Sequence, residues 1–343
     1  MSDLGEWLAG TGPDHDIVMS TRIRLARNVI RFPFLSRIEP EAKTDLEQFL
    51  RRELERADLG EVGYQNLDEA SQLDRDCLVE RHLISRDHAN GRGDRGVALE
   101  AQGTLSVMVN EEDHLRIQVL RSGLQTSAAF RHILDVDQRL EARLDYAYSP
   151  EFGYLTACPS NVGTGMRVSV MLHLPALVIT KKVEKVFNAV SKINLAVRGF
   201  FGEGTHSQGD FYQISNQITL GRSEEEILTS ISDYVPHIVE FERNMRNRLL
   251  SESRRAIEDR VYRALGLLQH ARLISSEETM EYLSAVRMGV NLGLIDWLSI
   301  AEVNELFLNT QPAHLQKHCG RQLESAERDA SRADYLRERL AGQ

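Results

Sequence analysis

Short runs in which hydrophobic and polar residues alternate occupy the first two thirds of the chain. They occur at residues 20–28 (STRIRLARN), 105–110 (LSVMVN), 115–120 (LRIQVL), 166–174 (MRVSVMLHL) and 193–199 (INLAVRG). Side chains that alternate with a period of two point to opposite faces of an extended chain, which is typical of half-buried β-strands. The runs therefore predict a sheet, and the short turns between neighbouring runs favour antiparallel pairing.

The hydrophobic period changes to that of a helix in three parts of the chain. Charged helical segments are predicted near residues 40–57 and 128–144, and helices continue after about residue 225. In this last part Ser275 with Glu278, and Ser299 with Glu302, have the spacing of a capping box. The last hundred or so residues are thus predicted to be a helical domain that follows an α/β (α+β) domain.

Composition and charge narrow the classes of function. The chain has 343 residues and a formal net charge of −10, which argues against non-specific binding to nucleic acid or to anionic membranes. No apolar run is long enough to span a membrane, and the acidic N-terminus lacks the features of a signal peptide. The three cysteines are far apart, which favours a reducing interior over a disulfide framework or a zinc site. We therefore predict a cytoplasmic protein.

Five arginines in the strand-like runs share one parity. They alternate with aliphatic residues, so each is expected to point away from the core, and a common sheet face can hold Arg22, Arg24, Arg116, Arg167 and Arg198. A single such arginine is more often a solvated strand residue. Five guanidinium groups in an acidic protein suit a ligand with many anionic oxygens, such as a nucleoside triphosphate. Neither a P-loop nor a kinase-type glycine-rich loop is present in the sequence.

Two carboxylates stand next to the predicted arginine face. Glu112 shares its parity with His114 and Arg116, so it can lie on that face if the strand extends back that far. Glu203 lies in a glycine-punctuated loop after Arg198. Taken alone, each glutamate is a solvated turn residue. Together they can orient a guanidinium and accept its proton, which phosphorylation of such a poor nucleophile requires.

Several motifs resemble those of the guanido (phosphagen) kinases. They are STRIR (20–24), NEEDHLRI (110–117), CPSNVGTGMR (158–167) and VRGFFGEG (197–204). The chain is more similar to the bacterial protein arginine kinases, through DIVMSTRIRLARN (16–28), HLIS (82–85), QISNQITLG (213–221) and EDRVYRALG (258–266). This likeness covers nearly the whole chain. It implies a guanido-kinase-type catalytic domain over residues 1–240, with a mostly antiparallel sheet flanked by helices, and a helical domain over residues 241–343.

The resemblance also implies roles for individual residues. Glu112 corresponds to the catalytic base, Glu203 to a second catalytic carboxylate on a loop, and Cys158 to the cysteine beside the substrate guanidinium. His82 would pack against the adenine, although from the sequence alone it is an ordinary partly buried histidine, and Cys158 a small core residue. The segments that correspond to ATP-binding residues contain Ser20, Thr21, Arg22, Ile23, Arg24, His82, Arg116, Arg167, Val168, Ser169, Val170, Met171, Arg198, Gly199, Phe200, Phe201, Gly202 and Glu203.

A further motif lies in the predicted helical domain. Residues 328–333 (RDASRA) resemble a motif that protein arginine kinases are thought to use as an allosteric phosphoarginine-binding site, with Arg328, Asp329 and Arg332 as its members. Without the resemblance these residues are an ordinary charged helix face with charges spaced four apart.

The expected activity is ATP-dependent phosphorylation of arginine side chains in proteins, with Mg²⁺ bridging the phosphates. The resemblance implies protein substrates with exposed or unfolded arginines, the Clp protease system and a heat-shock repressor as partners, a possible activator protein and a homodimer. A small-molecule guanidino kinase is an alternative, disfavoured because the STRIR strand begins at Ser20, without room for the helical N-terminal domain of those enzymes. A non-catalytic phosphoarginine-binding adaptor is a second alternative, disfavoured by the complete set of glutamates and arginines.

Overall fold

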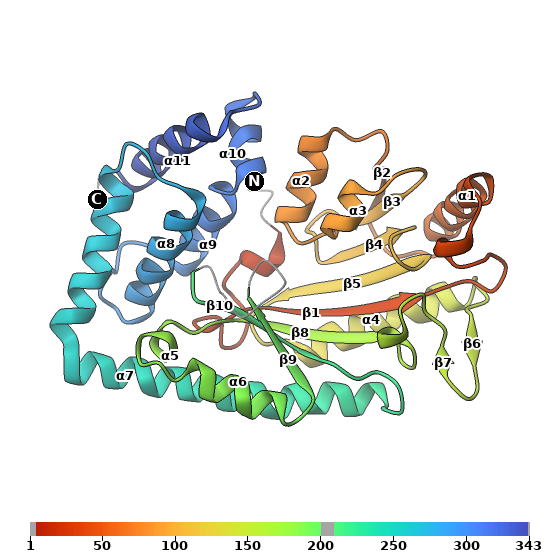
Figure 1. Cartoon of the computed structure of the whole chain (residues 1–343), viewed down its shortest axis with the longest axis horizontal. Helices are drawn as coiled ribbons and strands as arrows, with labels where there is room; N and C mark the ends of the chain where they lie inside the picture. Colours follow the sequence, from red (N-terminus) through yellow and green to blue (C-terminus); the bar gives the residue numbers. More distant parts are fainter. Residues whose placement is uncertain (1–4, 200–208, 342–343) are drawn as a thin grey trace.

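An eight-stranded antiparallel sheet forms the centre of the molecule. The structure is a computed structural model, and it describes residues 5–199 and 209–341 (Figure 1). The strand order is β2-β3-β4-β5-β1-β8-β10-β9, and all neighbouring pairs are antiparallel, which confirms the predicted sheet. The strands are β1 (Val18–Arg27), β2 (Val62–Asn66), β3 (Gly96–Glu100), β4 (Leu105–Val109), β5 (Leu115–Ser122), β8 (Met166–His173), β9 (Leu195–Gly199) and β10 (Phe211–Asn216), and a separate hairpin pairs β6 (Tyr148–Ser149) with β7 (Gly153–Tyr154).

One face of this sheet is covered by helices. Ile23, Ile117 and Val168 from the three central strands are fully buried in the larger hydrophobic core. Helices α1 (Pro40–Arg56), α4 (Thr126–Glu141), α6 (Val183–Ser191) and the first half of α7 (Glu224–His270) contribute leucine, isoleucine and valine side chains to the same core. The alternation within each strand therefore leaves the other residues of β1, β5 and β8 on the opposite face. The short helices α2 (Gln72–Glu80), α3 (Arg86–Asn90) and α5 (Pro175–Ile179) lie in the connections.

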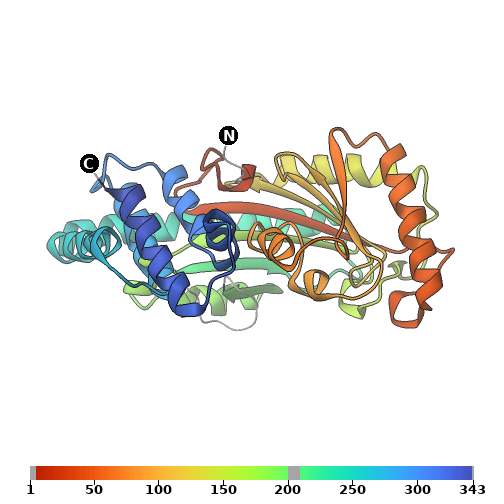
Figure 2. The same ribbon diagram turned by 90° about the horizontal axis from the view of Figure 1, so that it is seen from above.

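The second hydrophobic core belongs to a helical domain at one end of the molecule, opposite α1 (Figures 1 and 2). It consists of the second half of α7 with α8 (Ser276–Asn291), α9 (Ile300–Asn309), α10 (Pro312–Cys319) and α11 (Ser325–Leu340). The predicted capping boxes at the starts of α8 and α9 are confirmed.

Helix α7 joins the two cores without a linker. It runs for 47 residues, and Ser253 is its one residue with non-helical backbone angles (φ −143°, ψ 35°). The side chains of α7 belong to the core under the sheet as far as Met245 and to the helical domain from Ile257. Residue 240, where the domain boundary is predicted, lies in the segment of α7 that precedes the kink at Ser253, and the division into domains stays a prediction.

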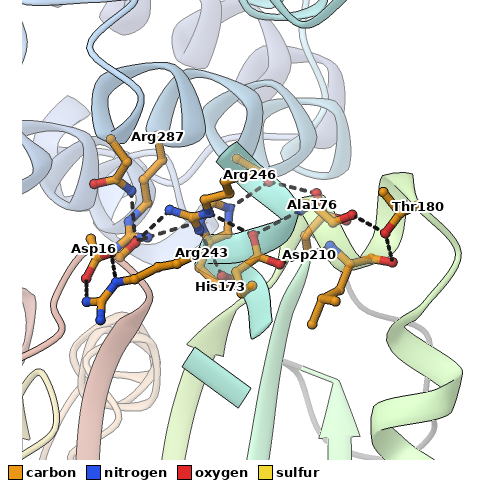
Figure 3. A network of polar contacts seen from close by, with 12 residues as sticks. Asp16, His173, Ala176, Thr180, Asp210, Arg243, Arg246 and Arg287 are labelled. Atoms are coloured by element: carbon orange, nitrogen blue, oxygen red, sulfur yellow. Dashed lines mark hydrogen bonds and ion pairs between the residues drawn. The ribbon is translucent and has the colours of Figure 1, made fainter. Parts of the chain in front are cut away.

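A buried polar network fixes the helical domain against the end of the sheet (Figure 3). Arg287 of α8 donates hydrogen bonds to Asp16 O (2.9 Å) and to His173 Nδ1 (3.0 Å). Because Nδ1 accepts, the ring proton is on Nε2, which lies 2.9 Å from Ser284 Oγ, and Ser284 in turn donates to Asp210 Oδ2 (2.9 Å). Burial, followed by the charge of Arg287, holds the pKa of His173 well below its usual value. The network therefore contains a neutral histidine that binds groups from both parts of the chain.

Candidate active site

The five predicted arginines lie together on the open face of the sheet. Arg24 on β1 is the register partner of Arg167 on β8, and Arg116 on β5 pairs with Ala26 two positions further along β1. Arg22 lies on the same face as Arg24, and Arg198 on β9 is the register partner of Gln213, whose side chain accepts a hydrogen bond from Arg22. The period of two in the sequence thus places all five guanidinium groups on one surface, which we call the arginine face.

Charge repulsion is strong on the arginine face. Burial, together with the charges of Arg116 and Arg167, lowers the pKa of Arg22 to about 10. Burial, then Arg198 and Arg116, lowers the pKa of Arg167 to about 10. Among residues 5–199 and 209–341, Arg116 is the one member of the five that forms an ion pair. An anionic ligand would relieve this repulsion and accept charge-assisted hydrogen bonds.

The strand β5 does not extend back to Glu112. Asn110 turns the chain with a positive φ of 61°, and the strand begins only at Leu115. His114, which shares the parity of Arg116 in the sequence, is fully buried away from the arginine face, where its Nδ1 accepts from Val29 N and its Nε2 lies 3.0 Å from Pro33 O. The extrapolation of the strand period to His114 is therefore wrong, because the turn resets the direction of the side chains.

Glu111 is a site residue that the sequence reasoning did not identify. Its Oε1 accepts hydrogen bonds from Arg116 Nη1 and Ser85 Oγ, both at 2.6 Å. Burial would raise the pKa of Glu111, but the charge and hydrogen bond of Arg116 outweigh it and the pKa falls to about 2. Glu111 therefore remains ionised and fixes the position of Arg116.

A small cavity at the end of the arginine face brings the two described catalytic candidates together. It has a volume of about 120 Å³, and Glu112, Cys158, Arg24, Arg116 and Arg167 are among its lining residues. Burial, followed by the charges of Asp113 and Glu111, raises the pKa of Glu112. A carboxylate with a raised pKa is a better proton acceptor than an ordinary one. The third catalytic candidate, Glu203, lies outside the described residues, as do Phe200, Phe201 and Gly202.

A larger cavity of about 280 Å³ lies at the other end of the arginine face. Arg22, Arg24 and Arg198 line one side of it, and His82 and Trp7 lie on another. The rings of His82 and Trp7 meet edge to face with 5.0 Å between their centroids. Burial, followed by the charges of Arg22 and Arg86, lowers the pKa of His82 to about 3, so its imidazole is neutral at physiological pH.

In the two predicted ATP-binding segments on β1 and β8, only alternate residues reach these cavities. Ser20, Ser169 and Met171 line a small void beside the larger cavity. Gly199 on β9 lines the larger cavity itself. The other residues of the two strand segments are fully buried on the covered face, as the strand period requires: Thr21, Ile23, Val168 and Val170.

Arg332 in the RDASRA motif is buried and joins three segments of the helical domain by hydrogen bonds. Its side chain is 1% exposed, and it donates hydrogen bonds to Thr310 O (2.9 Å), Ile274 O (2.9 Å) and Asp329 Oδ1 (2.7 Å). Arg328 donates to Leu323 O at 2.8 Å. Arg332 thus ties α11 to the connections before α8 and α10. Binding of phosphoarginine at this motif stays a prediction.

Comparison with known proteins agrees with this fold. Residues 45–245 match the family "ATP:guanido phosphotransferase, C-terminal catalytic domain", and residues 254–343 match "Protein-arginine kinase McsB C-terminal domain". In solved structures, the chain is similar to the duplicated taurocyamine kinase of Schistosoma mansoni (TM-score 0.62, 30% identity, 70% of this chain and 34% of that chain). It is also similar to lombricine kinase (TM-score 0.57, 27% identity, 68% of each chain). The fold and the site thus define a phosphotransferase of the guanido kinase type.

Curated relatives define the family more narrowly. The chain is 44% identical to the protein-arginine kinase of Halothermothrix orenii, over 98% of this chain and 97% of the relative. It is 46% identical to that of Symbiobacterium thermophilum, over 98% and 96% of the two chains. The chain belongs to the protein-arginine kinase family. Within residues 5–199 and 209–341, none of the helices combines the length and the apolar character that crossing a bilayer requires.

Proposed function

We propose that this chain transfers the γ-phosphoryl group of ATP to a guanidinium nitrogen of an arginine side chain in a protein. The observation that carries this proposal is the continuity of the arginine face with the cavity of Glu112 and Cys158. Arg24 lines both cavities, so a triphosphate bound along the face would end beside the carboxylate. Membership of the protein-arginine kinase family supports arginine as the acceptor.

The residues of the smaller cavity suit the chemistry of this transfer. Glu112 would orient the acceptor guanidinium and take the proton that its nitrogen loses as the N–P bond forms. The O–P bond to the β-phosphate breaks in the same step, and ADP is the leaving group. Arg116 and Arg167 line the same cavity and would stabilise the charge on the transferring phosphoryl group. We assign Cys158 to the contact with the acceptor, since it is half-buried in that cavity.

We propose that Mg²⁺ binds with the nucleotide. In the part of the chain that the structure describes, three His, Cys, Asp or Glu side chains do not gather anywhere to hold a metal ion. The Mg²⁺ would keep water ligands and be bound mainly through phosphate oxygens, where it would neutralise part of the phosphate charge.

The test is turnover of ATP with two acceptors, a denatured protein and free L-arginine. Phosphoarginine is measured as acid-labile N-phosphate in each reaction. We expect labelling of the protein and little or none of the free amino acid. Preference for free arginine would assign the chain to the small-molecule guanidino kinases, and binding of phosphoarginine without any turnover would make it an adaptor.

We also propose the wider context that the family resemblance suggests. Phosphorylated proteins would pass to a Clp-type protease, a heat-shock repressor would be one substrate, and the cytoplasm would be the place of action. The helical domain would form a homodimer, an activator protein would stimulate transfer, and Arg328, Asp329 and Arg332 would bind phosphoarginine. Sedimentation of the purified chain tests the dimer, and co-purification with a Clp-type ATPase tests the first partner.

A further inference from the structure

We propose that the helical domain forms one wall of the nucleotide site and that its residues Phe307 and Gln311 recognise the base. The larger cavity is bounded on one side by the arginine face and on another by the helical domain, through Met280 of α8, Phe307 and Leu308 of α9 and Gln311 before α10. This inference rests on the proposed function, since it takes ATP as the ligand of that cavity.

The lining of the cavity divides into a cationic and a largely apolar half. Arg22, Arg24 and Arg198 of the sheet supply the cationic half, together with Arg86 at the start of α3. The apolar half contains side chains from the N-terminal 3-10 helix, from β10 and from the helical domain, namely Trp7, Leu8, Phe211, Met280, Phe307 and Leu308. A ligand that fits both halves carries several negative charges at one end and a flat apolar group at the other. A nucleoside triphosphate has this composition, with its base in the apolar half.

The ring of Phe307 is held in place by the sheet. It meets the ring of Phe211 on β10 edge to face, with 5.1 Å between the centroids, and its side chain is almost fully buried. Aromatic pairs of this geometry are favourable beyond their buried area. Phe307 therefore offers a fixed apolar surface that lies on the helical domain but is aligned by the catalytic part of the chain.

Gln311 provides a polar group in the apolar half. Its amide Nε2 donates to Phe307 O at 3.1 Å and to Met280 Sδ at 3.4 Å, so both amide hydrogens are engaged inside the helical domain. The side-chain oxygen is then the atom that Gln311 can present to a ligand. A base with an exocyclic amino group, such as adenine, can donate to it, whereas hypoxanthine has a carbonyl oxygen at the corresponding position.

Two contacts keep this wall beside the arginine face. Glu80 at the end of α2, which also lines the cavity, accepts hydrogen bonds from Ala313 N (2.7 Å) and His314 N (2.9 Å), two and three residues after Gln311. On the other side of the junction, Arg287 binds Asp16 O and His173 (Figure 3). The wall is therefore positioned before any ligand binds, which lowers the cost of ordering the site.

The test compares three ligands on full-length variants by equilibrium binding. The ligands are ATP, inosine triphosphate and inorganic triphosphate. The variants are Phe307→Leu, which removes the ring and retains an apolar side chain, and Gln311→Ala. Gln269→Ala is the matched control, because Gln269 also donates its amide to a backbone carbonyl of the helical domain, that of Leu340, but does not line the cavity.

The expected result separates the base from the phosphates. Phe307→Leu weakens binding of ATP and inosine triphosphate alike, by roughly fivefold to tenfold. Gln311→Ala weakens ATP by a similar factor and leaves inosine triphosphate unchanged. Both variants bind inorganic triphosphate like the parent, which also shows that they are folded, and Gln269→Ala changes none of the three affinities.

Two results would overturn the inference. One is binding of ATP by both variants with the affinity of the parent, and the other is an equal loss of inorganic triphosphate binding. Either result can occur while the parent still phosphorylates protein arginine, in which case the proposed function stands. Conversely, the variants could bind ATP more weakly while the parent does not phosphorylate arginine. That result would refute the proposed function but support the role of Phe307 and Gln311 in binding the base.

Discussion

The carboxylate of Glu111 lies 2.6 Å from Nη1 of Arg116, at the turn that leads into β5. This pair is almost buried on the glutamate side, where the side chain is 4% exposed. It neutralises one of the five arginines, whereas Arg22 and Arg167 form hydrogen bonds to the uncharged side chains of Gln213 and Ser215. The pair therefore holds the Arg116 guanidinium in one position in the lining of the cavity that contains Glu112.

Glu111→Gln should loosen Arg116 and lower the stability of the protein. Because the pKa of Glu111 is lowered from 4.5 to about 2, its ionised form stabilises the fold fully above about pH 4.5, and this stabilisation is lost as the pH falls toward 2. Urea unfolding of the variant and the parent should differ most at pH 7, differ less as the pH falls below 4.5, and converge only at about pH 2. The control is Glu55→Gln, which removes an exposed ion pair with Arg51 and should have little effect at either pH. A stability difference independent of pH would contradict this assignment.

Glu112→Gln should retain ATP binding and lose transfer. The variant keeps the shape of the side chain but cannot accept a proton, and loss of such a group typically costs a factor of about 10² to 10⁴ in rate. The pKa of Glu112 is raised above 4.5, so the rate of the parent should fall as the pH is lowered through that raised value, because the protonated carboxyl cannot act as a base. The phosphorylation rate is measured from pH 5 to 8, with Glu151→Gln, an exposed glutamate, as the control. Near-normal transfer by Glu112→Gln would remove it from the mechanism.

The position of the arginine face could be predicted from the sequence because the strand period is a local property. Ile23 and Arg24, or Arg167 and Val168, need only their own strand to face opposite sides. The role of Glu111 could not be predicted in the same way. It depends on the turn at Asn110, and a shift of one residue in the start of β5 exchanges the faces on which the preceding side chains lie.

Contacts between residues far apart in the chain also could not be predicted from the sequence. Phe307 meets Phe211, and Glu80 meets Ala313, across separations that no local period encodes. The burial of Arg332 could not be predicted for the same reason. Its spacing of four from Arg328 is equally typical of a solvated helix face and of a face that packs against other segments. The larger cavity is likewise lined by residues from both parts of the chain, so no local period predicts it.

Arg167→Lys should abolish most of the transfer activity. Arg167 donates Nη2 to Ser215 Oγ at 3.0 Å while it lines the cavity of Glu112, and a lysine ammonium cannot reproduce this forked geometry. Loss of a charge-stabilising arginine in phosphoryl transfer can cost roughly 10³-fold or more in rate. The measurement is single-turnover phosphorylation, with Arg139→Lys on the exposed side of α4 as the control. Equal rates for Arg167→Lys and the parent would place Arg167 outside the site.

Glu80→Gln should weaken the junction of α2 and α10. The carboxylate accepts two backbone N–H groups at the start of α10 and also contacts His314 Nδ1 at 2.6 Å. Loss of the charge should lower the free energy of unfolding by about 1 to 2 kcal/mol. Asp74→Asn, which removes the exposed pair with Lys317 between the same helices, should change it by less than about 0.5 kcal/mol. Equal effects of the two substitutions in urea unfolding would show that Glu80 is not a specific anchor.

Arg332→Ala should destabilise the protein even without a ligand. Its removal leaves the buried carbonyls of Thr310 and Ile274 without their donor, which costs about 1 to 3 kcal/mol. Arg328 is more exposed, so Arg328→Ala is the cleaner test of phosphoarginine binding. Calorimetric titration with phosphoarginine should show weaker binding to Arg328→Ala than to a Glu112→Gln protein. Equal binding to both would make Arg328 an ordinary surface arginine.

The kink of α7 at Ser253 has a consequence for how the two parts of the protein are joined. Two helical segments meet there directly, so the two cores are connected through one irregular residue and not through a flexible linker (Figure 1). A change in the backbone angles of Ser253 alone would therefore change the angle between the two helical segments of α7, and with it the position of the helical domain beside the sheet.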